Sequence, residues 1–212
     1  MTSIRNAPGE RPRPRLVLAT ANQKKLAELD RILAAARIEV DLAGRGEFPG
    51  APDVAETGAT FAENALLKAR AIADFTGLPT VADDSGLCVD ALNGMPGVLS
   101  ARWSGRHGDD AANLNLVLAQ VGDVPDERLG ARFVCAAALV VPGDGEYIGE
   151  GVVTGRLIRE PRGSNGFGYD PIFKPDGYEL TTAEMDPADK DKISHRGRAL
   201  RALAPEICRS VR

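Results

Sequence analysis

Two long runs of strand-forming residues, joined by a short turn, constrain the fold of this chain more than any other feature. Residues Ala131–Val141 and Tyr147–Ile158 are rich in apolar side chains, and Pro142-Gly-Asp-Gly145 between them has the composition of a turn. The spacing predicts a long antiparallel hairpin. The rest of the fold has to be built around a sheet that contains these two strands.

The first half of the chain alternates strand and helix patterns. Arg15–Thr20 reads as a buried strand. Helical spacing of apolar residues and capping residues predict four helices, which are Lys24–Ala36, Phe61–Thr76, Asn113–Val121 and a last helix capped by Ser194. Thr80–Ala82 predicts a strand, with Leu87–Val89 as its continuation or a hairpin partner, and Glu160–Pro175 predicts a structured loop. We therefore expect an α/β domain with a mixed, twisted central sheet and flanking helices.

Composition narrows the class of protein. The chain has 212 residues, of which 43% are hydrophobic and 26% charged, and this fits one domain, or two closely joined lobes, over residues 15–212. A net charge of -4 argues against a nucleic-acid binder. No apolar segment reaches the roughly 20 residues of a membrane span, and three scattered cysteines suggest reduced thiols in a cytoplasm. The proline- and arginine-rich residues 1–14 predict a disordered tail.

The acidic segment Val81-Ala-Asp-Asp-Ser-Gly-Leu87 is the first candidate site. An apolar run that ends in carboxylates is typical of a strand delivering ligands for magnesium into a loop. Because successive strand residues point to opposite faces, only one of Asp83 and Asp84 is expected to serve a shared site, and we favour Asp84. Glu56 could be the second carboxylate. The alternative is that Asp83-Asp84-Ser85-Gly86 is merely a polar turn.

Cationic segments accompany the carboxylates. Thr20-Ala-Asn-Gln-Lys-Lys25 joins a strand to a helix start, which is a place for a phosphate cradle or for an Asn cap followed by two solvated lysines. Lys68 lies one turn after Asn64 on the same helix face, which could look into a cleft or into solvent.

Two further segments carry candidate ligand contacts. His195 and Arg196 in the first turn of the last helix oppose its dipole, which either serves an acidic ligand or is tolerated at the surface. Phe167 and Tyr169 among glycines could stack a flat base, or they could plug the edge of a core.

Taken together, these segments resemble a known family. The motifs that carry the resemblance are Thr20-x-Asn22-x-x-Lys25, Glu56-Thr-Gly58, Glu63-Asn-Ala65 with Lys68-Ala69, Ala82-Asp-Asp-Ser-Gly86, Pro96-Gly97 with Ser100-Ala-Arg102, Gly166-Phe-Gly-Tyr-Asp-Pro-Ile-Phe173 and Ser194-His-Arg-Gly197. In this order they resemble the Ham1-like inosine triphosphate pyrophosphatase family. The resemblance implies two lobes around a nucleotide cleft, a homodimer, and magnesium-dependent hydrolysis of ITP, dITP and XTP to the monophosphate and pyrophosphate.

The resemblance also implies roles for individual residues. Asp84 would accept a proton from the attacking water and bind the metal with Glu56, and Asp83 would support them. Triphosphate contacts would come from Thr20, Asn22, Lys25 and Lys68, and Ser85 would touch the substrate. The base would be enclosed by Phe167, Gly168, Tyr169 and Asp170 and read by Lys190, His195 and Arg196. Two rivals stay open: a non-catalytic nucleotide sensor and a phosphatase of modified phosphomonoesters.

Overall fold

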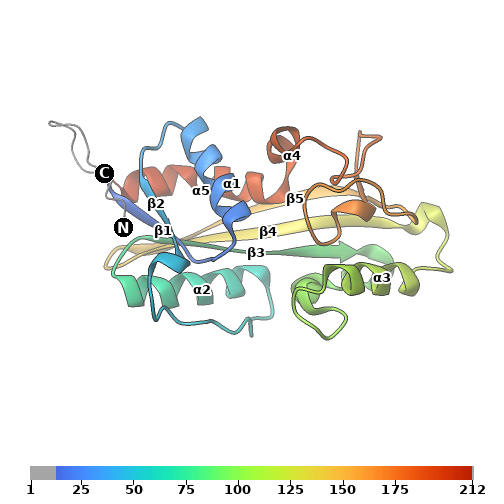
Figure 1. The fold of residues 1–212 in the computed structure, drawn as a ribbon, viewed down its shortest axis with the longest axis horizontal. Helices are drawn as coiled ribbons and strands as arrows, with labels where there is room; N and C mark the ends of the chain where they lie inside the picture. The colour runs from blue at the N-terminus through green and yellow to red at the C-terminus, as the bar shows by residue number, and fades with distance from the viewer. Residues whose placement is uncertain (1–12, 212) are drawn as a thin grey trace.

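A six-stranded mixed sheet forms the centre of the molecule (Figure 1). The computed structural model describes residues 13–211. The strands lie in the order β2-β1-β3-β4-β5-β6, with bounds β1 Arg15–Leu18, β2 Asp41–Gly44, β3 Thr80–Val89, β4 Gly130–Val141, β5 Gly145–Leu157 and β6 Phe173–Pro175. β1 is parallel to β2 and β3, and the remaining neighbours are antiparallel. The predicted mixed sheet and its long hairpin are confirmed.

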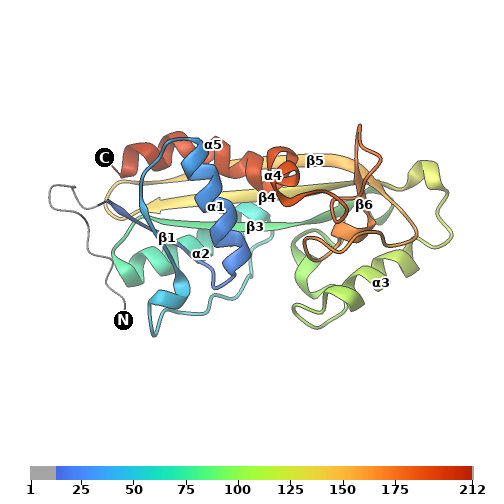
Figure 2. The ribbon, with the colours of Figure 1, turned by 45° about the horizontal axis from the view of Figure 1, so that its top comes forward.

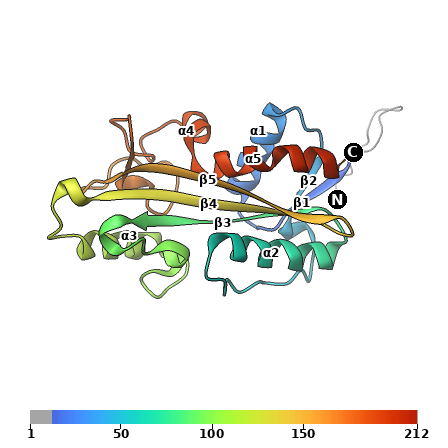
Figure 3. The ribbon, with the colours of Figure 1, turned by 180° about the vertical axis from the view of Figure 1, so that it is seen from behind.

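Helices cover the sheet unequally at its two ends. The helices are α1 Gln23–Ala35, α2 Phe61–Thr76, α3 Asp110–Gln120, α4 Pro187–Ile193 and α5 His195–Ser210. Around one end of the long strands, α1 and α5 lie on one side and α2 on the other (Figures 1 and 3). α3 and β6 lie around the other end (Figure 2). The long strands β3, β4 and β5 therefore run through both lobes.

Three apolar clusters hold these layers together. α1 and α5 pack on β1 and on residues of β3 and β4 such as Val81 and Leu139. α2 packs on the opposite face through alanines, including Ala69 against Ala82 and Ala138. α3 and β6 close the far end around Leu87 and Phe173. Small side chains under α2 let that helix lie close to the strand that carries the candidate carboxylates.

Local sequence signals placed most elements correctly. α2 has the predicted bounds, because Thr60 accepts the Glu63 N–H at its start and Gly77, at φ 68°, ends it. Two expectations were wrong. The acidic segment is not a turn or a strand end, since β3 continues through it to Val89 in register with β4, and Leu87–Val89 is the continuation of the strand and not a hairpin partner. The 160–175 segment is not all loop, because its last three residues add β6 to the sheet edge.

Two short elements carry little local signal in the sequence. β2 and α4 were not predicted, and both are short, with four and seven residues. Most of the expected tail, residues 1–12, lies outside the described residues. Within residues 13–211, no helix is both long and apolar enough to cross a bilayer.

Candidate active site

Asp83 and Asp84 lie in the middle of β3, opposite Ala137 and Ala136 of β4. Both carboxylates are buried, with 5% and 7% of the residue exposed. Because the residues are adjacent in a strand, their side chains leave opposite faces of the sheet. Strand alternation therefore separates the two carboxylates, as expected from the sequence, and no turn rotates them onto one face.

Asp83 is held by two cations on the α1 and α5 face. Its Oδ2 accepts from Lys25 Nζ at 2.9 Å and from Arg196 Nε at 3.0 Å. Burial alone would raise the pKa of Asp83, but the charges of Lys25 and Arg196 outweigh burial and hold that pKa well below its ordinary range. Arg196 also donates to Glu28 at 3.2 Å and to Ser85 Oγ at 3.1 Å. This network explains why a cation at the start of α5 is tolerated.

Asp84 faces α2, where it meets a second polar group. Asn64 Nδ2 donates to Asp84 Oδ2 at 2.9 Å, and Lys68 Nζ lies 3.6 Å from Asp84 Oδ1. Lys68 also donates to Glu56 Oε1 at 2.6 Å. The functional interpretation of the Asn64 and Lys68 face is thus supported over the solvated one, because both side chains point to β3 and Asn64 is fully buried.

Glu56, Lys68 and Asp84 shift one another's pKa values. Burial raises the pKa of Asp84, with Glu56 adding to the rise and Lys68 opposing it. Burial would also raise the pKa of Glu56, but Lys68 and Arg102 outweigh it and lower that pKa. The pKa of Lys68 is raised, because the charges of Asp84 and Glu56 exceed the effect of its burial. Asp84 is consequently the carboxylate here that binds a proton most readily.

The carboxylates of Glu56 and Asp84 converge on one cationic centre, the Lys68 ammonium. Magnesium commonly takes one or two carboxylates, with waters and substrate phosphates as its other ligands. Glu56 and Asp84 fit that donor set. Residues 13–211 contain no group of three or more Asp, Glu, His or Cys side chains that would hold a metal alone. A metal at this place would therefore complete its coordination with waters or with oxygen atoms of a substrate.

The segment Thr20–Lys25 combines both interpretations offered for it. Asn22 caps α1, since its Oδ1 accepts from the N–H groups of Lys24 at 2.9 Å and Lys25 at 3.4 Å. Thr20 Oγ1 in turn accepts from the Asn22 N–H at 3.2 Å. The lysines are not simply solvated, because Lys25 pairs with Asp83 and Lys24 Nζ lies 3.5 Å from the Gly166 carbonyl.

A gap in strand pairing lies beside the two aspartates. β1 pairs with β3 only at Val17–Thr80 and Leu18–Val81, and the Ala19 N–H ends this contact on the Val81 carbonyl. The next contact on that edge comes from Ser100 Oγ, which accepts from the Leu87 N–H. Among the described strands, none covers the edge of β3 between these points. A ligand can therefore contact both faces of β3 across this edge.

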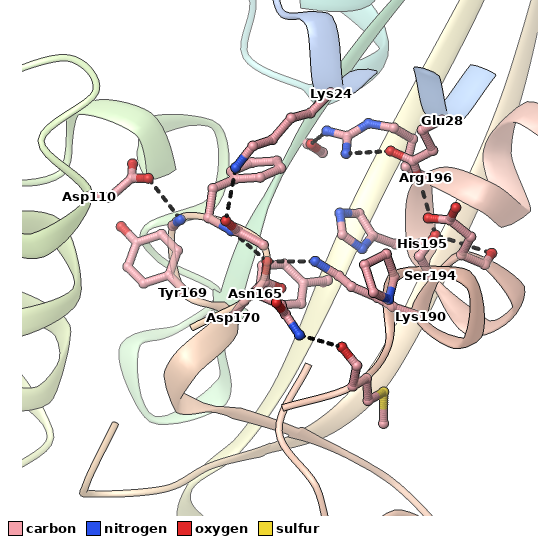
Figure 4. A pocket seen from close by; sticks show the side chains of 18 of the residues that line it. Lys24, Glu28, Asp110, Asn165, Tyr169, Asp170, Lys190, Ser194, His195 and Arg196 are labelled. Atoms are coloured by element: carbon pink, nitrogen blue, oxygen red, sulfur yellow. Dashed lines mark hydrogen bonds and ion pairs between the residues drawn. The ribbon is translucent and has the colours of Figure 1, made fainter. Parts of the chain in front are cut away.

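A cavity of about 490 Å³ opens on the Asp83 face (Figure 4). It lies between α1, the segment 164–170, and the region of α4 and the start of α5 from Pro187 to Arg196. Of the predicted site residues it is lined by Ser85, Phe167, Gly168, Tyr169, Asp170, Lys190, His195 and Arg196. The remaining ones, Thr20, Asn22, Lys25, Glu56, Lys68, Asp83 and Asp84, do not line it. The site thus has two parts joined at the open edge of β3.

The aromatic residues of the cavity have different roles. Phe167 is 44% exposed, and the charged ends of Lys190 and Arg196 each lie 5.7 Å from its ring centre. Tyr169 is buried in the core around α3, and its hydroxyl donates to the Ser100 carbonyl at 2.8 Å. The expected aromatic pair is thus one exposed ring, Phe167, and one fixed wall, Tyr169.

Hydrogen bonds shape the loop that carries Phe167. Asp170 accepts from the Phe167 N–H at 2.9 Å, from Lys190 Nζ at 2.5 Å and from the Thr182 hydroxyl at 2.7 Å. The Gly168 N–H donates to Asp110 at 2.9 Å. Asp170 therefore fixes the loop rather than offering a free carboxylate to a ligand.

His195 is a neutral hydrogen-bonding group. Its ring stacks on Phe133, with centres 4.8 Å apart and planes inclined by 11°. Burial, followed by the nearby charges of Arg196 and Lys190, moves the pKa of His195 well below 6.5. At neutral pH this side chain can present one N–H donor and one acceptor to a ligand in the cavity.

Comparison with known proteins places this arrangement in a family. The model of the Ham1 family matches residues 16–206. The chain belongs to the Ham1 family. A protein named dITP/XTP pyrophosphatase from Streptomyces coelicolor is 58% identical over 193 residues, which are 91% of this chain and 96% of that protein. One of the same name from Nocardia farcinica is 61% identical over 194 residues, covering 91% and 94%.

Solved Ham1 structures share the fold. The nucleoside-triphosphatase, or dITP/XTP pyrophosphatase, of Mycobacterium abscessus has a TM-score of 0.75 and 57% identity, covering 91% of this chain and 99% of its own. A HAM1 protein from Coxiella burnetii has a TM-score of 0.84 and 44% identity, covering 92% and 99%. The resemblance inferred from the motifs is confirmed.

Several polar residues of this Ham1 site were missing from the predicted set. Asn64 contacts Asp84, and Arg102 contacts Glu56. Glu28 contacts Arg196, and Asp110 contacts the Gly168 N–H. Asn64 and Arg102 belong to motifs that carried the resemblance, so their position in those motifs was an available signal. Glu28 reads as a polar position of an amphipathic helix, and nothing local distinguishes it.

Proposed function

We propose that this chain hydrolyses dITP, XTP and ITP to the nucleoside monophosphate and pyrophosphate. The observation that carries the proposal is the pairing of a cavity of about 490 Å³, large enough to admit a purine base, with the Glu56, Lys68 and Asp84 cluster across the open edge of β3. The names of the Streptomyces coelicolor and Nocardia farcinica relatives support the same activity. Such an enzyme removes noncanonical purine nucleotides from the nucleotide pool.

The base would occupy the cavity with its polar edge toward His195, Lys190 and Arg196. Hypoxanthine and xanthine carry a 6-oxo acceptor, whereas adenine carries a 6-amino donor. Donors from Lys190 or the neutral His195 can pair with the 6-oxo group of hypoxanthine or xanthine. With adenine in the cavity the same donors stay unpaired, and an unpaired buried donor disfavours the wrong base more strongly than a lost apolar contact does. Rejection of GTP must then depend on its 2-amino group.

The triphosphate would cross the edge of β3 toward Lys25 and Lys68. Both ammonium groups are already placed by carboxylates, Lys25 by Asp83 and Lys68 by Glu56, so little side-chain entropy is lost when phosphate arrives. Glu56 and Asp84 would hold magnesium, which when bound supplies charge neutralisation of the phosphates. The cations thus orient the α-phosphorus close to Asp84.

Asp84 would accept the proton of the attacking water. Its pKa is raised by burial, and a stronger base is the better proton acceptor at neutral pH. Asn64 fixes the carboxylate through Oδ2, which leaves Oδ1 directed to the side of Lys68. Attack at the α-phosphorus breaks its bond to the bridging oxygen, and pyrophosphate leaves.

Product analysis tests the proposal. Pyrophosphate release would be measured for XTP, dITP, ITP, GTP and ATP with and without magnesium. We expect fast release from the first three and slow release from the last two. Orthophosphate as first product would favour the phosphomonoesterase, and binding without turnover would favour the sensor. Assembly as a homodimer stays a prediction.

A further inference from the structure

The 3-10 helix η3, Gly97–Arg102, lies between the two parts of the site. Ser100 and Ala101 line the base cavity. The next residue, Arg102, points to the carboxylate cluster, where its Nη2 donates to the backbone carbonyl of Glu56 at 3.0 Å and its Nη1 to Glu56 Oε2 at 3.3 Å. Three consecutive residues therefore touch both the cavity and a proposed metal ligand.

The cavity end of η3 is firmly anchored. The Ser100 side chain accepts from the Leu87 N–H at 2.9 Å and donates to the Gly97 carbonyl at 2.6 Å. The Ser100 carbonyl accepts from the Tyr169 hydroxyl at 2.8 Å, and Tyr169 also lines the cavity. A base that presses on this wall therefore acts on a short, hydrogen-bonded segment and not on a loose loop.

At the Glu56 side of η3, the Glu56 residue is held by Arg102 and by Lys68, whose Nζ donates to Glu56 Oε1 at 2.6 Å. Glu56 lies in the irregular connection between β2 and α2, residues 48–60. Arg102 holds both its backbone carbonyl and its side chain, and the Gly58 N–H donates to Asn64 Oδ1 at 2.7 Å. The rigid fork of an arginine can fix two acceptors at once, which a lysine cannot do. Lys68 thus holds one carboxylate oxygen of Glu56, while Arg102 holds the other oxygen together with the Glu56 backbone carbonyl.

We propose that Arg102 is a positioning residue that couples filling of the base cavity to placement of the Glu56 carboxylate beside Asp84. This inference rests on the proposed function and adds to it the route by which the correct base promotes turnover. A base that packs against Ser100 and Tyr169 restricts the motion of η3. Through the two contacts of Arg102, the motion of Glu56 is restricted as well. Selectivity then shows in kcat as well as in binding.

Hydrogen exchange with inosine monophosphate as the probe, without metal, tests the coupling without turnover. In the wild type, exchange slows by about fivefold, the low end of typical coupling between sites, in peptides covering both 164–170 and 55–60. Arg102→Gln should keep the first response and lose the second. Arg132→Gln is the matched control, since its ion pair with Asp90 at 2.8 Å touches neither region. It should keep both responses.

The outcomes separate the two proposals. A wild type in which 164–170 does not respond overturns the proposed base cavity and the coupling with it. A response at 55–60 that survives in Arg102→Gln overturns the coupling alone. Arg102→Lys, which keeps the charge but cannot make both contacts, should also lose the 55–60 response if the fork matters.

Kinetics give an independent reading. With XTP, Arg102→Gln should lower kcat about tenfold with KM changed less than about twofold, the pattern of an interaction that matters in the transition state. Tyr169→Phe, which removes the hydrogen bond to the Ser100 carbonyl, should lower kcat too. Because both residues act on the same pathway, the loss of kcat in the double variant should be smaller than the two single losses combined. An unchanged kcat in Arg102→Gln, or a loss matched by Arg132→Gln, would overturn the proposal.

Discussion

Asp83 and Asp84 are sequence neighbours whose carboxylates serve opposite faces of β3. Asp83 accepts hydrogen bonds from Lys25 and Arg196. Asp84 accepts one from Asn64 and forms an ion pair with Lys68. The pKa of the first is lowered and that of the second is raised, because cations surround Asp83 and burial dominates at Asp84. One aspartate is thereby fitted to hold structure and the other to accept a proton.

Asp84→Asn should abolish pyrophosphate release without unfolding the protein. Loss of a general base lowers rates by about 10²- to 10⁴-fold. The fold should tolerate the change, because Asn can accept from Asn64 and removes a carboxylate whose charge burial disfavours. Activity on XTP and thermal melting would be measured together. Near-wild-type turnover would instead assign the base to Asp83 or Glu56.

Asp83→Asn should mainly reduce stability. The change leaves Arg196 and Lys25 without their shared carboxylate, and removing one partner of a buried ion pair destabilises by about 3–5 kcal/mol. Urea unfolding at pH 7 would measure the loss. A variant with wild-type stability would show that the network is not essential to the fold.

The same ion pair predicts how stability depends on acid. The folded-state pKa of Asp83 lies well below the unfolded value of about 3.9, so its contribution is present above pH ~4 and is lost as pH falls toward the folded pKa. The difference in unfolding free energy between wild type and Asp83→Asn should therefore shrink between pH 5 and pH 2. A constant difference would contradict the assigned pKa direction.

Periodicity and capping predicted the elements whose signals are local. α2 was placed to the residue because its two caps, Thr60 and Gly77, directly flank it and its apolar stripe lies between them. β3 was cut short because Asp83-Asp84-Ser85-Gly86 has turn composition, and the groups that stabilise it as a strand are far away in sequence. Lys25 lies 58 residues from Asp83, and Arg196 lies 113 residues away. Pairing across such distances leaves no trace in a local pattern.

The motifs grouped site residues that are far apart in the sequence, which local patterns of periodicity and capping cannot do. The motifs placed Glu56, Lys68 and Asp84 in one set, and the structure brings their side chains within contact distance. Strand alternation separated Asp83 from Asp84, but the motifs did not indicate which of the other site residues line the base cavity and which lie outside it. Strand alternation and the short pairing of β1 with β3 produce that division, and both depend on register.

His195 should make stability depend on pH near neutrality. Its folded-state pKa is below the unfolded value of about 6.5, so the unfolded chain binds the proton more readily and stability falls as pH decreases below ~6.5. His195→Gln should remove this dependence between pH 7.5 and pH 5.5, measured by urea unfolding. His107→Gln, at an exposed position, is the control and should retain it. An equal pH dependence in both variants would contradict the lowered pKa of His195.

Gly151→Ala tests whether the seating of α5 on β5 sets the base site. A Cβ at Gly151 would overlap the carbonyl of His195 and lie 2.6 Å from the Ala199 nitrogen, so α5 would have to move. We expect destabilisation of about 3 kcal/mol, as for an overpacked core, together with reduced preference for XTP over GTP, because His195 and Arg196 move with the helix. Gly46→Ala, with no neighbour within 4 Å, is the control and should change neither property. Melting curves and kcat/KM ratios for the two nucleotides measure both effects, and a destabilised variant with unchanged preference would separate base reading from the position of α5.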